Sequence, residues 1–491
     1  MKLFILLLSS TLITTNGPQD SLKSDFQINN FRLKSHESLA SFKDKNKVQG
    51  LAFAVFNKNE TLFSECLGNS TNGFKINDET IFSIQSISKN ITTLAIMTAV
   101  QDGLLNLDSP ITEYLPSFTI NSCFEDSPEQ KITLRMLLSH TAGFTHEAPI
   151  GNNYDYTPCD TKDHIKSINK TWLKFPVGTN YSYSNLGLDL AAAIIAQKTG
   201  ASFSDYLKSK IFQPLSMANT TADDKEVVLN KNRTEGNISA VKKKHYSIPL
   251  PGSGAVYTSL IDFIKYTQLL MNYGETNNKT LINKKYLYEM CKINIQNYGL
   301  GTYIDKDNNI LYVNHNGGGF GYSATLLWFP EYNLGSVILC NKPCNTYDIC
   351  FSIMNEYINT SGLSKNPNIT AAFDSINGYY FENKEIIDKR NAFTYKCDSL
   401  FKPEWQKYVG KYKVIIKGMD IKWYAKIAHL LGFGYQRIKI VPVGQVLQVF
   451  GDFGNSTLKE FEPGLFFTGD NEALDLRTEK PTFRNVLIQK K

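Results

Sequence analysis

The stretch from Phe82 to Met97 restricts the fold of this chain most, because it places a Ser-x-x-Lys pair where an apolar helix begins. Ser86 and Lys89 are three residues apart, so on a helix their side chains share one face and can touch. The lysine can take the proton of the serine hydroxyl if burial or a second cation lowers the lysine pKa. The pair therefore predicts a serine nucleophile that needs no histidine.

The Ser-x-x-Lys spacing by itself is common, and its weight comes from the surrounding sequence. Each further occurrence is best explained as a solvated surface pair. These occurrences are Ser167/Lys170, Ser239/Lys242, Ser399/Lys402 and Ser456/Lys459. Around Ser86, in contrast, apolar residues precede the serine and continue to Gly103 in a pattern typical of a buried helix. A lysine at the start of such a helix is costly unless it has a partner or a function.

Two further segments carry side chains suited to acyl transfer. Tyr183 lies in a polar turn before a predicted helix, where it can serve as an anionic base or a proton relay if a lysine lowers its pKa. Asn185 in the same turn offers an amide to a substrate carbonyl. The run His315–Gly319 ends a predicted strand, and its glycines let a substrate backbone lie along the strand edge. Taken alone, His315 is better explained as a hydrogen-bonded histidine.

The order of the predicted elements indicates an α/β fold followed by a second, β-rich unit. Strand patterns stand at both ends of a long helical region, which favours one mixed sheet built from distant segments. These strands are predicted at Leu51–Phe56, Thr61–Leu67, Tyr312–His315, Ala324–Phe329 and Ser336–Cys340. Residues 219–246 are predicted to form a long surface loop. Short strands after about Lys402 predict a separate β domain.

The chain of 491 residues is long enough for two or three units. We predict a signal peptide over residues 1–17, an N-terminal arm over 18–47 and a main domain over 48–361. A linker follows over 362–397, and a lipocalin-like β domain fills 398–491.

The N-terminus is typical of a secreted protein. Lys2 is followed by a short apolar region that is far below the ~20 residues of a membrane-spanning helix, and no other segment is long enough. Twelve Asn-x-Ser/Thr sequons agree with export, although Asn90 and Asn180 lie next to candidate site residues and are poor glycosylation sites. We expect an extracellular or secretory-pathway protein without a membrane span.

Eight cysteines, an even number, favour disulfides in a secreted chain. Cys123 with Cys159, and bridges within Cys340, Cys344 and Cys350, are the candidate pairings. The spacing of these cysteines and the absence of a histidine cluster in the sequence argue against a zinc site, so we expect neither metal nor cofactor. A net charge of +6 with interspersed signs gives no reason to expect a nucleic-acid partner. The oligomeric state stays open.

Taken together, Ser86-x-x-Lys89, Tyr183-x-Asn185 and His315-x-Gly317 resemble the motifs of the serine β-lactamase-related hydrolases. These include class C β-lactamases, D-alanyl-D-alanine carboxypeptidases and related esterases. The resemblance extends over roughly residues 48–360. It is carried also by Thr80–Lys89, Gly103–Leu115, Ile132–Phe144, Pro176–Gly187 and His315–Ser323. It implies an antiparallel sheet flanked by helices, a helical subdomain and a small C-terminal β-barrel.

The resemblance also implies a role for each matching residue. Ser86 would form an acyl-enzyme, while Lys89 and Tyr183 would share the proton transfers. The substrate would be held by Asn185, His315 and the glycine strand. The backbone N–H groups of Ser86 and Gly318 would form the oxyanion hole. No aspartate or glutamate stands out as a deacylation base.

Two departures from the family pattern bear on the substrate. Gln85 replaces a small residue before the serine, where it either crowds the pocket or hydrogen-bonds the substrate. His315 replaces the lysine of many members and so removes a permanent cation that would grip a carboxylate. This favours ester or small-amide hydrolysis within the broader class of small-molecule or peptide acyl substrates.

Three functions stay open from the sequence: an active serine hydrolase, a catalytically retired binding or structural protein, and an enzyme that transfers the acyl group to an acceptor other than water. An α/β-hydrolase and a metalloprotease are disfavoured, since the sequence contains neither Gly-x-Ser-x-Gly nor His-Glu-x-x-His.

Overall fold

The computed structural model describes residues 18–491 except for 156, 239–244, 246, 248, 277–278, 308, 392–399, 416–436 and 453; residues 18–26 and 386–391 are described by their backbone alone. The predicted signal peptide, residues 1–17, lies outside the described residues.

A six-stranded sheet in the order β2-β1-β10-β9-β8-β7 forms the centre of the main domain. Its strands are β1 (Gly50–Phe56), β2 (Thr61–Gly68), β7 (Tyr303–Asp307), β8 (Ile310–Gly319), β9 (Tyr322–Phe329) and β10 (Leu334–Cys340). All five pairings are antiparallel. The sheet is therefore built from distant segments, as predicted. It also confirms the antiparallel sheet that the family resemblance implied, whereas the mixed sheet expected from the strand patterns alone was wrong.

Strand β1 shows why the sheet is covered on both faces. Its seven residues are all apolar or glycine and all buried. Since successive side chains of a strand point to opposite faces, Leu51, Phe53 and Val55 pack in one core cluster and their neighbours in another. A strand with this composition requires helices on both sides.

Helices provide these two layers. They are α1 (Pro18–Lys45), α2 (Ser88–Gln101), α3 (Leu134–Leu138), α4 (Thr161–Ile168), α5 (Asn185–Thr199), α6 (Phe203–Leu207), α7 (Asp224–Leu229), α8 (Leu260–Met271), α9 (Lys284–Met290), α10 (Tyr347–Ser361) and α11 (Pro367–Asn391). Short helical turns are η1 (Gln85–Ile87), η2 (Ile111–Glu113), η3 (Pro128–Gln130), η4 (Lys208–Phe212), η5 (Pro330–Tyr332) and η6 (Pro403–Tyr408). Two-stranded pairs join β3 (Phe82–Ser83) with β4 (Tyr257–Thr258) and β5 (Glu275–Thr276) with β6 (Lys279–Thr280).

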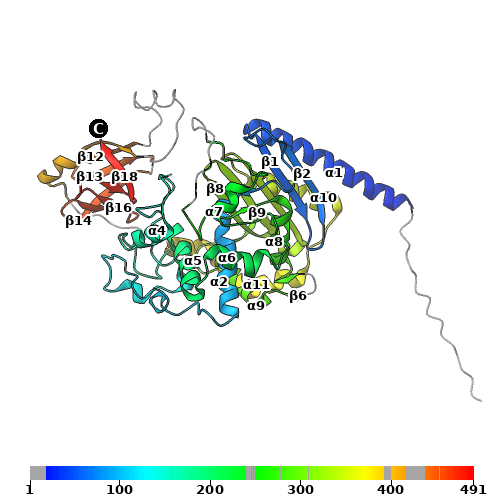
Figure 1. Cartoon of the computed structure of the whole chain (residues 1–491), viewed down its shortest axis with the longest axis horizontal. Helices are drawn as coiled ribbons and strands as arrows, with labels where there is room; N and C mark the ends of the chain where they lie inside the picture. The colour runs from blue at the N-terminus through cyan, green and yellow to red at the C-terminus, as the bar shows by residue number, and fades with distance from the viewer. Residues whose placement is uncertain are drawn as a thin grey trace, which may run out of the picture.

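The N-terminal arm is the long helix α1, which packs along α10 and reaches β2 (Figure 1). Phe31 of α1 is buried, with its ring edge against Phe63 and Tyr357. The predicted N-terminal arm is thus a part of the outer layer, because a few apolar residues in its mostly polar sequence pack in one core cluster with residues of α10.

Two segments predicted to be irregular contain helices. Within the predicted linker 362–397, α11 buries Phe373 and Tyr380 at helical spacing, while residues 392–397 lie outside the described part. Within the predicted loop 219–246, α7 is capped by Asp223, whose side chain accepts a hydrogen bond from the Lys225 N–H, and buries Val227. Sparse apolar residues were sufficient in both cases because their helices pack on an existing surface.

The C-terminal domain is a closed barrel of eight antiparallel strands, as the β-rich pattern predicted. It lies at one end of the molecule, in orange and red in Figure 1. The strands are β11 (Gly410–Val414), β12 (Arg437–Val443), β13 (Val446–Gly451), β14 (Ser456–Glu462), β15 (Leu465–Phe467), β16 (Ala473–Asp475), β17 (Thr482–Phe483) and β18 (Val486–Lys490). Alternating side chains and the buried Trp405 fill its core.

The barrel contacts the main domain through the segment Thr145–Glu147. The Thr145 hydroxyl donates to Oε2 of Glu472 at 2.6 Å, and Nδ2 of Asn485 donates to the Glu147 carbonyl at 2.9 Å. Glu472 also pairs with Lys174 at 2.9 Å, where both side chains are largely buried. This interface therefore includes an ion pair that solvent screens weakly.

Replacing Glu472 by alanine is expected to lower the free energy of unfolding by about 2–3 kcal/mol. The change leaves the Thr145 hydroxyl without its acceptor and leaves Lys174 with only the more distant Asp470 carboxylate at 3.9 Å. Urea titration measures the change. The matched control is Glu462→Ala, which removes a barrel carboxylate paired with Arg477 at 2.6 Å on the surface. It should stay within about 0.5 kcal/mol of wild type, and equal losses in the two variants would contradict a structural role of this interface.

The predicted disulfides are absent from the part of the chain that is described. Cys66, Cys123, Cys159, Cys291, Cys340, Cys344 and Cys350 are all free, and Cys397 lies outside the described residues. Cys159 lies against Gly151. Burial instead raises the pKa of the Cys123 thiol, against the opposing effect of the Lys459 charge in the barrel. The two cysteines of this predicted pair therefore lie in different surroundings. Cys340 and Cys344 interact as thiols through a hydrogen bond.

Across the residues that can be described, no helix combines the length and apolarity needed to cross a bilayer. Within the same residues, no three His, Cys, Asp or Glu side chains gather closely enough to hold a metal ion.

Candidate active site

Ser86 stands out in its segment because solvent can reach it. Every other residue from Ile81 to Asn90 is buried, whereas Ser86 is partly exposed. The chain runs from β3 through the turn η1 into α2, so the serine lies at the point where strand changes to helix. The hydroxyl is thus presented on a rigid support at the sheet surface.

Lys89 is fully buried and has three neighbours that define its place. Its Nζ lies 3.0 Å from Oγ of Ser86 and donates to the Ser253 carbonyl at 3.0 Å. It also lies 4.8 Å from the centre of the Tyr183 ring. Burial lowers the pKa of Lys89 to about 7, against the opposing charges of Asp189 and Glu147. A neutral amine able to accept the serine proton is therefore well populated near pH 7.

Tyr183 and Asn185 flank Ser184, the residue that caps α5. The Ser184 hydroxyl accepts a hydrogen bond from the Leu186 N–H and donates to the Thr145 carbonyl. This fold of the turn brings the Tyr183 hydroxyl into a hydrogen bond with Ser86. Burial raises the Tyr183 pKa above its usual value. Of the two predicted roles, this favours a neutral phenol that relays protons over an anionic base. The Asn185 side chain is buried beside this turn.

The glycine strand lies directly against the turn that carries the serine. A Cβ atom on Gly317 would meet the Ile84 carbonyl oxygen at 2.0 Å, so only glycine permits this approach of β8 to η1. A Cβ on Gly318 would meet nothing within 4 Å, and this residue is exposed. Gln85 is buried with a positive φ of 49°, and its amide donates to Oγ of Ser83 at 2.7 Å. Its side chain therefore fills space beside the glycine strand, next to Gly319.

His315 joins the site but lies behind its surface, with 1% of its area exposed. Its Nδ1–H donates to the Asn316 carbonyl at 2.8 Å, and Nε2 lies 3.3 Å from the Tyr298 hydroxyl. Burial and the Lys89 charge lower the pKa of His315 to about 3, so the imidazole is neutral. Its ring centre is 6.4 Å from that of Tyr183. The segments around residues 86, 183 and 315 thus meet in one place.

Comparison with known proteins agrees with this geometry. A family model described as "Beta-lactamase" matches residues 37–348, nearly two thirds of the chain. This chain belongs to the β-lactamase family. The matched region contains every candidate site residue and ends before the barrel.

Two curated relatives of this β-lactamase-family chain are "Beta-lactamase-like protein 4" of Dictyostelium discoideum and "Protein flp" of Staphylococcus aureus (strain MRSA252). The first is 26% identical over 322 residues, covering 59% of this chain and 56% of that protein. The second is 24% identical over 277 residues, covering 54% of each. The chain thus spans a little over half the length of these relatives.

One solved structure resembles nearly the whole molecule. It is the "octameric penicillin-binding protein homologue from Pyrococcus abyssi", with a TM-score of 0.56 and 19% identity, and it covers 92% of this chain and 94% of that one. At this identity the likeness shows the fold alone. The alignment covers more of the chain than the family model does and includes the barrel.

A group of aromatic side chains around the lysine was missed in the sequence. The His140 ring lies 4.5 Å from Tyr183 and 4.9 Å from Tyr298, measured between ring centres. Its Nδ1 accepts a hydrogen bond from the Ser184 N–H at 3.2 Å. His140 lies in the segment Ile132–Phe144, which resembles a family motif, so the sequence could have indicated it as a site residue. Tyr298 lies in no such motif and could not have been identified from the sequence.

His146 was also missed, and it lies at the outer side of Tyr183. The two rings are stacked, with centres 5.8 Å apart, and the imidazole is partly exposed. Its Nδ1 lies 2.7 Å from Oε1 of the buried Glu147, and its backbone carbonyl accepts a hydrogen bond from the Asn185 N–H at 3.3 Å. The segment that contacts the barrel therefore also contacts the start of α5.

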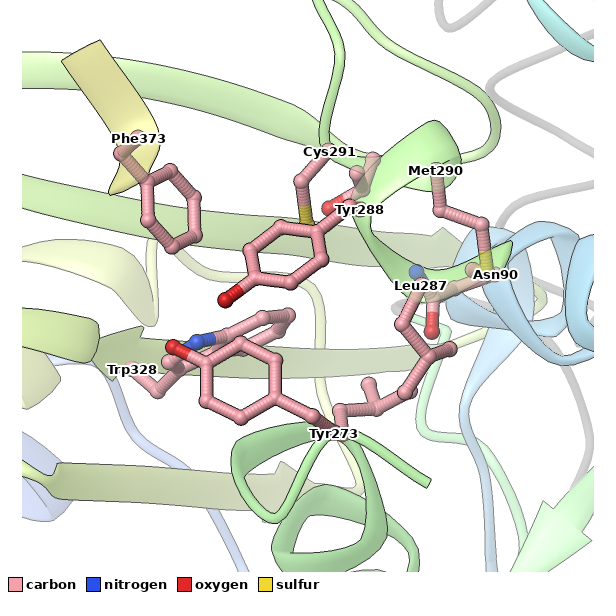
Figure 2. A pocket seen from close by; sticks show the side chains of 10 residues that line it. Asn90, Tyr273, Leu287, Tyr288, Met290, Cys291, Trp328 and Phe373 are labelled. Carbon is pink, nitrogen blue, oxygen red and sulfur yellow. The ribbon is translucent and has the colours of Figure 1, made fainter. Parts of the chain in front are cut away.

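A small cavity beside α2 is separate from this site. Asn90 and the apolar or aromatic side chains of α8, α9, β9 and α11 line it (Figure 2). Its open volume of about 10 Å³ accommodates about one water molecule. Asn90 donates to the Gly301 carbonyl and accepts from the Tyr266 hydroxyl, so this buried amide serves packing. Its sequon is inaccessible in the folded chain, as is that of the buried Asn180.

Proposed function

We propose that this chain is a serine hydrolase that cleaves an ester, amide or peptide bond through an acyl-enzyme, with Ser86 as the nucleophile. The observation that carries the proposal is the buried Lys89 amine, 3.0 Å from the Ser86 hydroxyl and with a pKa lowered to about 7. An amine of this kind is neutral often enough near pH 7 to act as a general base.

Acylation begins with attack of Oγ of Ser86 on the carbonyl carbon of the substrate. The hydroxyl proton moves to the neutral Nζ of Lys89, and the carbonyl electron pair moves to the oxygen. Backbone N–H groups of Ser86 and Gly318 hold this oxyanion. Collapse of the tetrahedral species breaks the bond to the leaving group, which takes a proton relayed through the Tyr183 hydroxyl.

Deacylation repeats these steps with water. The water loses a proton through Tyr183 to Lys89 as its oxygen attacks the acyl carbon. The bond to Oγ of Ser86 then breaks, and Lys89 returns a proton to this oxygen, which restores the serine hydroxyl and the neutral amine. Asn185 orients the acyl group in both steps. The neutral, buried His315 supports Tyr298 from behind the site and supplies no fixed cation for a substrate carboxylate. This supports an ester or small amide over a substrate with a terminal carboxylate.

We also propose that the enzyme acts outside the cytoplasm. The apolar N-terminal segment and the sequons of the sequence support a secreted protein, extracellular or in the lumen of the secretory pathway.

A fluorophosphonate probe tests the proposal, because it bonds covalently to activated serines. The folded full chain is expected to take up one equivalent of probe, with the mass added to the peptide that contains Ser86. Ser86→Ala should abolish the uptake, whereas Ser456→Ala, at a partly exposed serine of another Ser-x-x-Lys pair in the barrel, should leave it intact. Absence of labelling in well-folded wild type would contradict the enzyme and favour a retired, ligand-binding member.

The substrate class is tested with a panel of short-chain aryl esters, D-Ala-D-Ala peptides and a chromogenic cephalosporin. We expect turnover of the aryl esters to exceed that of the carboxylate-bearing substrates. Preferential turnover of the peptides or the cephalosporin would contradict the argument from His315.

A further inference from the structure

Asp189 is a carboxylate in an otherwise apolar helix. It is the only charged residue of α5 between Asn185 and Ala196, and its side chain is fully buried. A carboxylate in such surroundings is stable only when donors satisfy its oxygens. Its partners therefore indicate what it is retained for.

Four donors surround the Asp189 carboxylate. Oδ1 accepts from the backbone N–H groups of Gly252 and Ser253 at 3.0 and 2.9 Å. Oδ2 accepts from the Ser253 hydroxyl at 3.1 Å and from Nε2 of His164 at 3.1 Å. One helix side chain thus fixes a turn and joins it to α4.

His164 is equally buried and uses both ring nitrogens as donors. Its Nδ1 lies 2.7 Å from the Ile150 carbonyl, which can only accept, while Nε2 faces the Asp189 carboxylate. A histidine with two acceptors of this kind carries two protons and a positive charge. Burial lowers the pKa of His164, but the hydrogen bond and charge of Asp189 outweigh this effect and raise it.

The turn held by Asp189 leads directly to Lys89. The Gly252 carbonyl accepts from the Thr92 hydroxyl at 2.6 Å, and the next carbonyl, of Ser253, accepts from Nζ of Lys89. A Cβ on Gly252 would lie 2.0 Å from the Leu188 carbonyl oxygen, so the turn fits closely against α5. The contacts run without a gap from His164 to the lysine.

We propose that His164 and Asp189 are a pair of positioning residues for the Ser86–Lys89 site: they hold the Ser253 carbonyl against Lys89, and their opposite charges balance the electrostatic field at the amine. The inference rests on the proposed function, since it concerns the lysine as a base. It assigns a task to two buried charges that touch no substrate.

The two charges act on the amine with opposite signs. The Asp189 carboxylate stabilises the ammonium form of Lys89 and raises its pKa. A positive charge on His164, on the far side of this carboxylate, should oppose that effect, because like charges repel. Beside His164 itself lie Asp189, the Glu147 carboxylate and the neutral thiol of Cys159. The other titratable groups that face Lys89 are Glu147, whose charge also raises its pKa, and the neutral Tyr183, His140 and His315.

The pH dependence of fluorophosphonate labelling tests the pair. Only neutral Lys89 accepts the serine proton. The labelling rate constant of wild type should therefore have a low-pH limb, which begins near pH 7 and falls about tenfold for each pH unit below it. His164→Gln removes the cation and should move this limb up by about one pH unit. Asp189→Asn removes the anion and should move the limb down by a similar amount. His36→Gln, at an exposed histidine of α1, should leave the profile unchanged.

Opposite shifts support the proposal, because damage to the fold alone would lower the rate without moving the limb in two directions. Shifts of the same sign, or none in folded variants, would overturn it. Since a variant can fail to fold, ¹⁵N NMR of the histidines in wild type gives a second test. His164 should carry two protons at pH 7, and a single proton there would also overturn the proposal. If wild type takes up no probe while His164 is doubly protonated, the proposed hydrolase fails and the ion pair stands.

Discussion

Replacing Lys89 by alanine is expected to lower the rate constant for labelling and turnover by about 10⁴-fold or more, as severely as Ser86→Ala. The reason is that the serine and the amine act as one unit: without the neutral amine 3.0 Å away, the Ser86 hydroxyl has no group to take its proton. The neutral Tyr183 phenol does not replace this base, because burial raises its pKa. Labelling rates measured over pH 6–9 check the loss.

The control for this variant comes from the chain itself. Lys170→Ala removes the exposed lysine of another Ser-x-x-Lys pair and should keep the wild-type rate. Circular dichroism of Lys89→Ala should keep the wild-type spectrum. A folded Lys89→Ala protein that labels at near-normal rates would refute the lysine as the base.

Gly317→Ala should damage both the stability of the fold and the labelling of Ser86. The added Cβ would lie 2.0 Å from the Ile84 carbonyl oxygen, so β8 and the turn carrying Ser86 must separate. We expect the free energy of unfolding to fall by about 2 kcal/mol or more. A displacement of about 1 Å at the nucleophile also predicts a loss of labelling rate of about 100-fold.

The neighbouring glycine provides a matched control for stability. At Gly318 a Cβ atom would meet no other group within 4 Å, so Gly318→Ala should unfold within about 0.5 kcal/mol of wild type. Urea titration of the two variants side by side compares one methyl group at adjacent positions. If Gly317→Ala unfolds like Gly318→Ala, the close approach of strand and turn is not required.

The sequence was most informative where a motif fixes local structure. The Ser86–Lys89 spacing predicted two side chains in contact at the start of α2, and the strand predictions recovered β1, β2, β8, β9 and β10. Such features depend on neighbours in the chain. The order of the three motifs along the chain resembles that of a known family, and this resemblance predicted that the segments of Tyr183 and His315 lie near the serine.

Burial and long-range packing set what the sequence left open. Tyr183 stays neutral because the fold removes it from water, and no residue type in its turn predicts that. Asp189 did carry a signal, as a lone acid in an apolar helix, but its partner His164 is 25 residues away and could not be paired with it. The helix α11 was taken for a linker because only a few of its residues, such as Phe373, are apolar and buried.

The partners of Lys89 are spread widely along the chain. Ser86 is three residues away, but the Ser253 carbonyl lies 164 residues further on, and the contact of Thr145 with the barrel spans 327 residues. A nascent polypeptide therefore carries Ser86 long before the ribosome has made the groups that would activate it. Under the proposed function, its hydroxyl is expected to stay as inert as any other serine during synthesis and to become reactive only once the chain has folded around the amine.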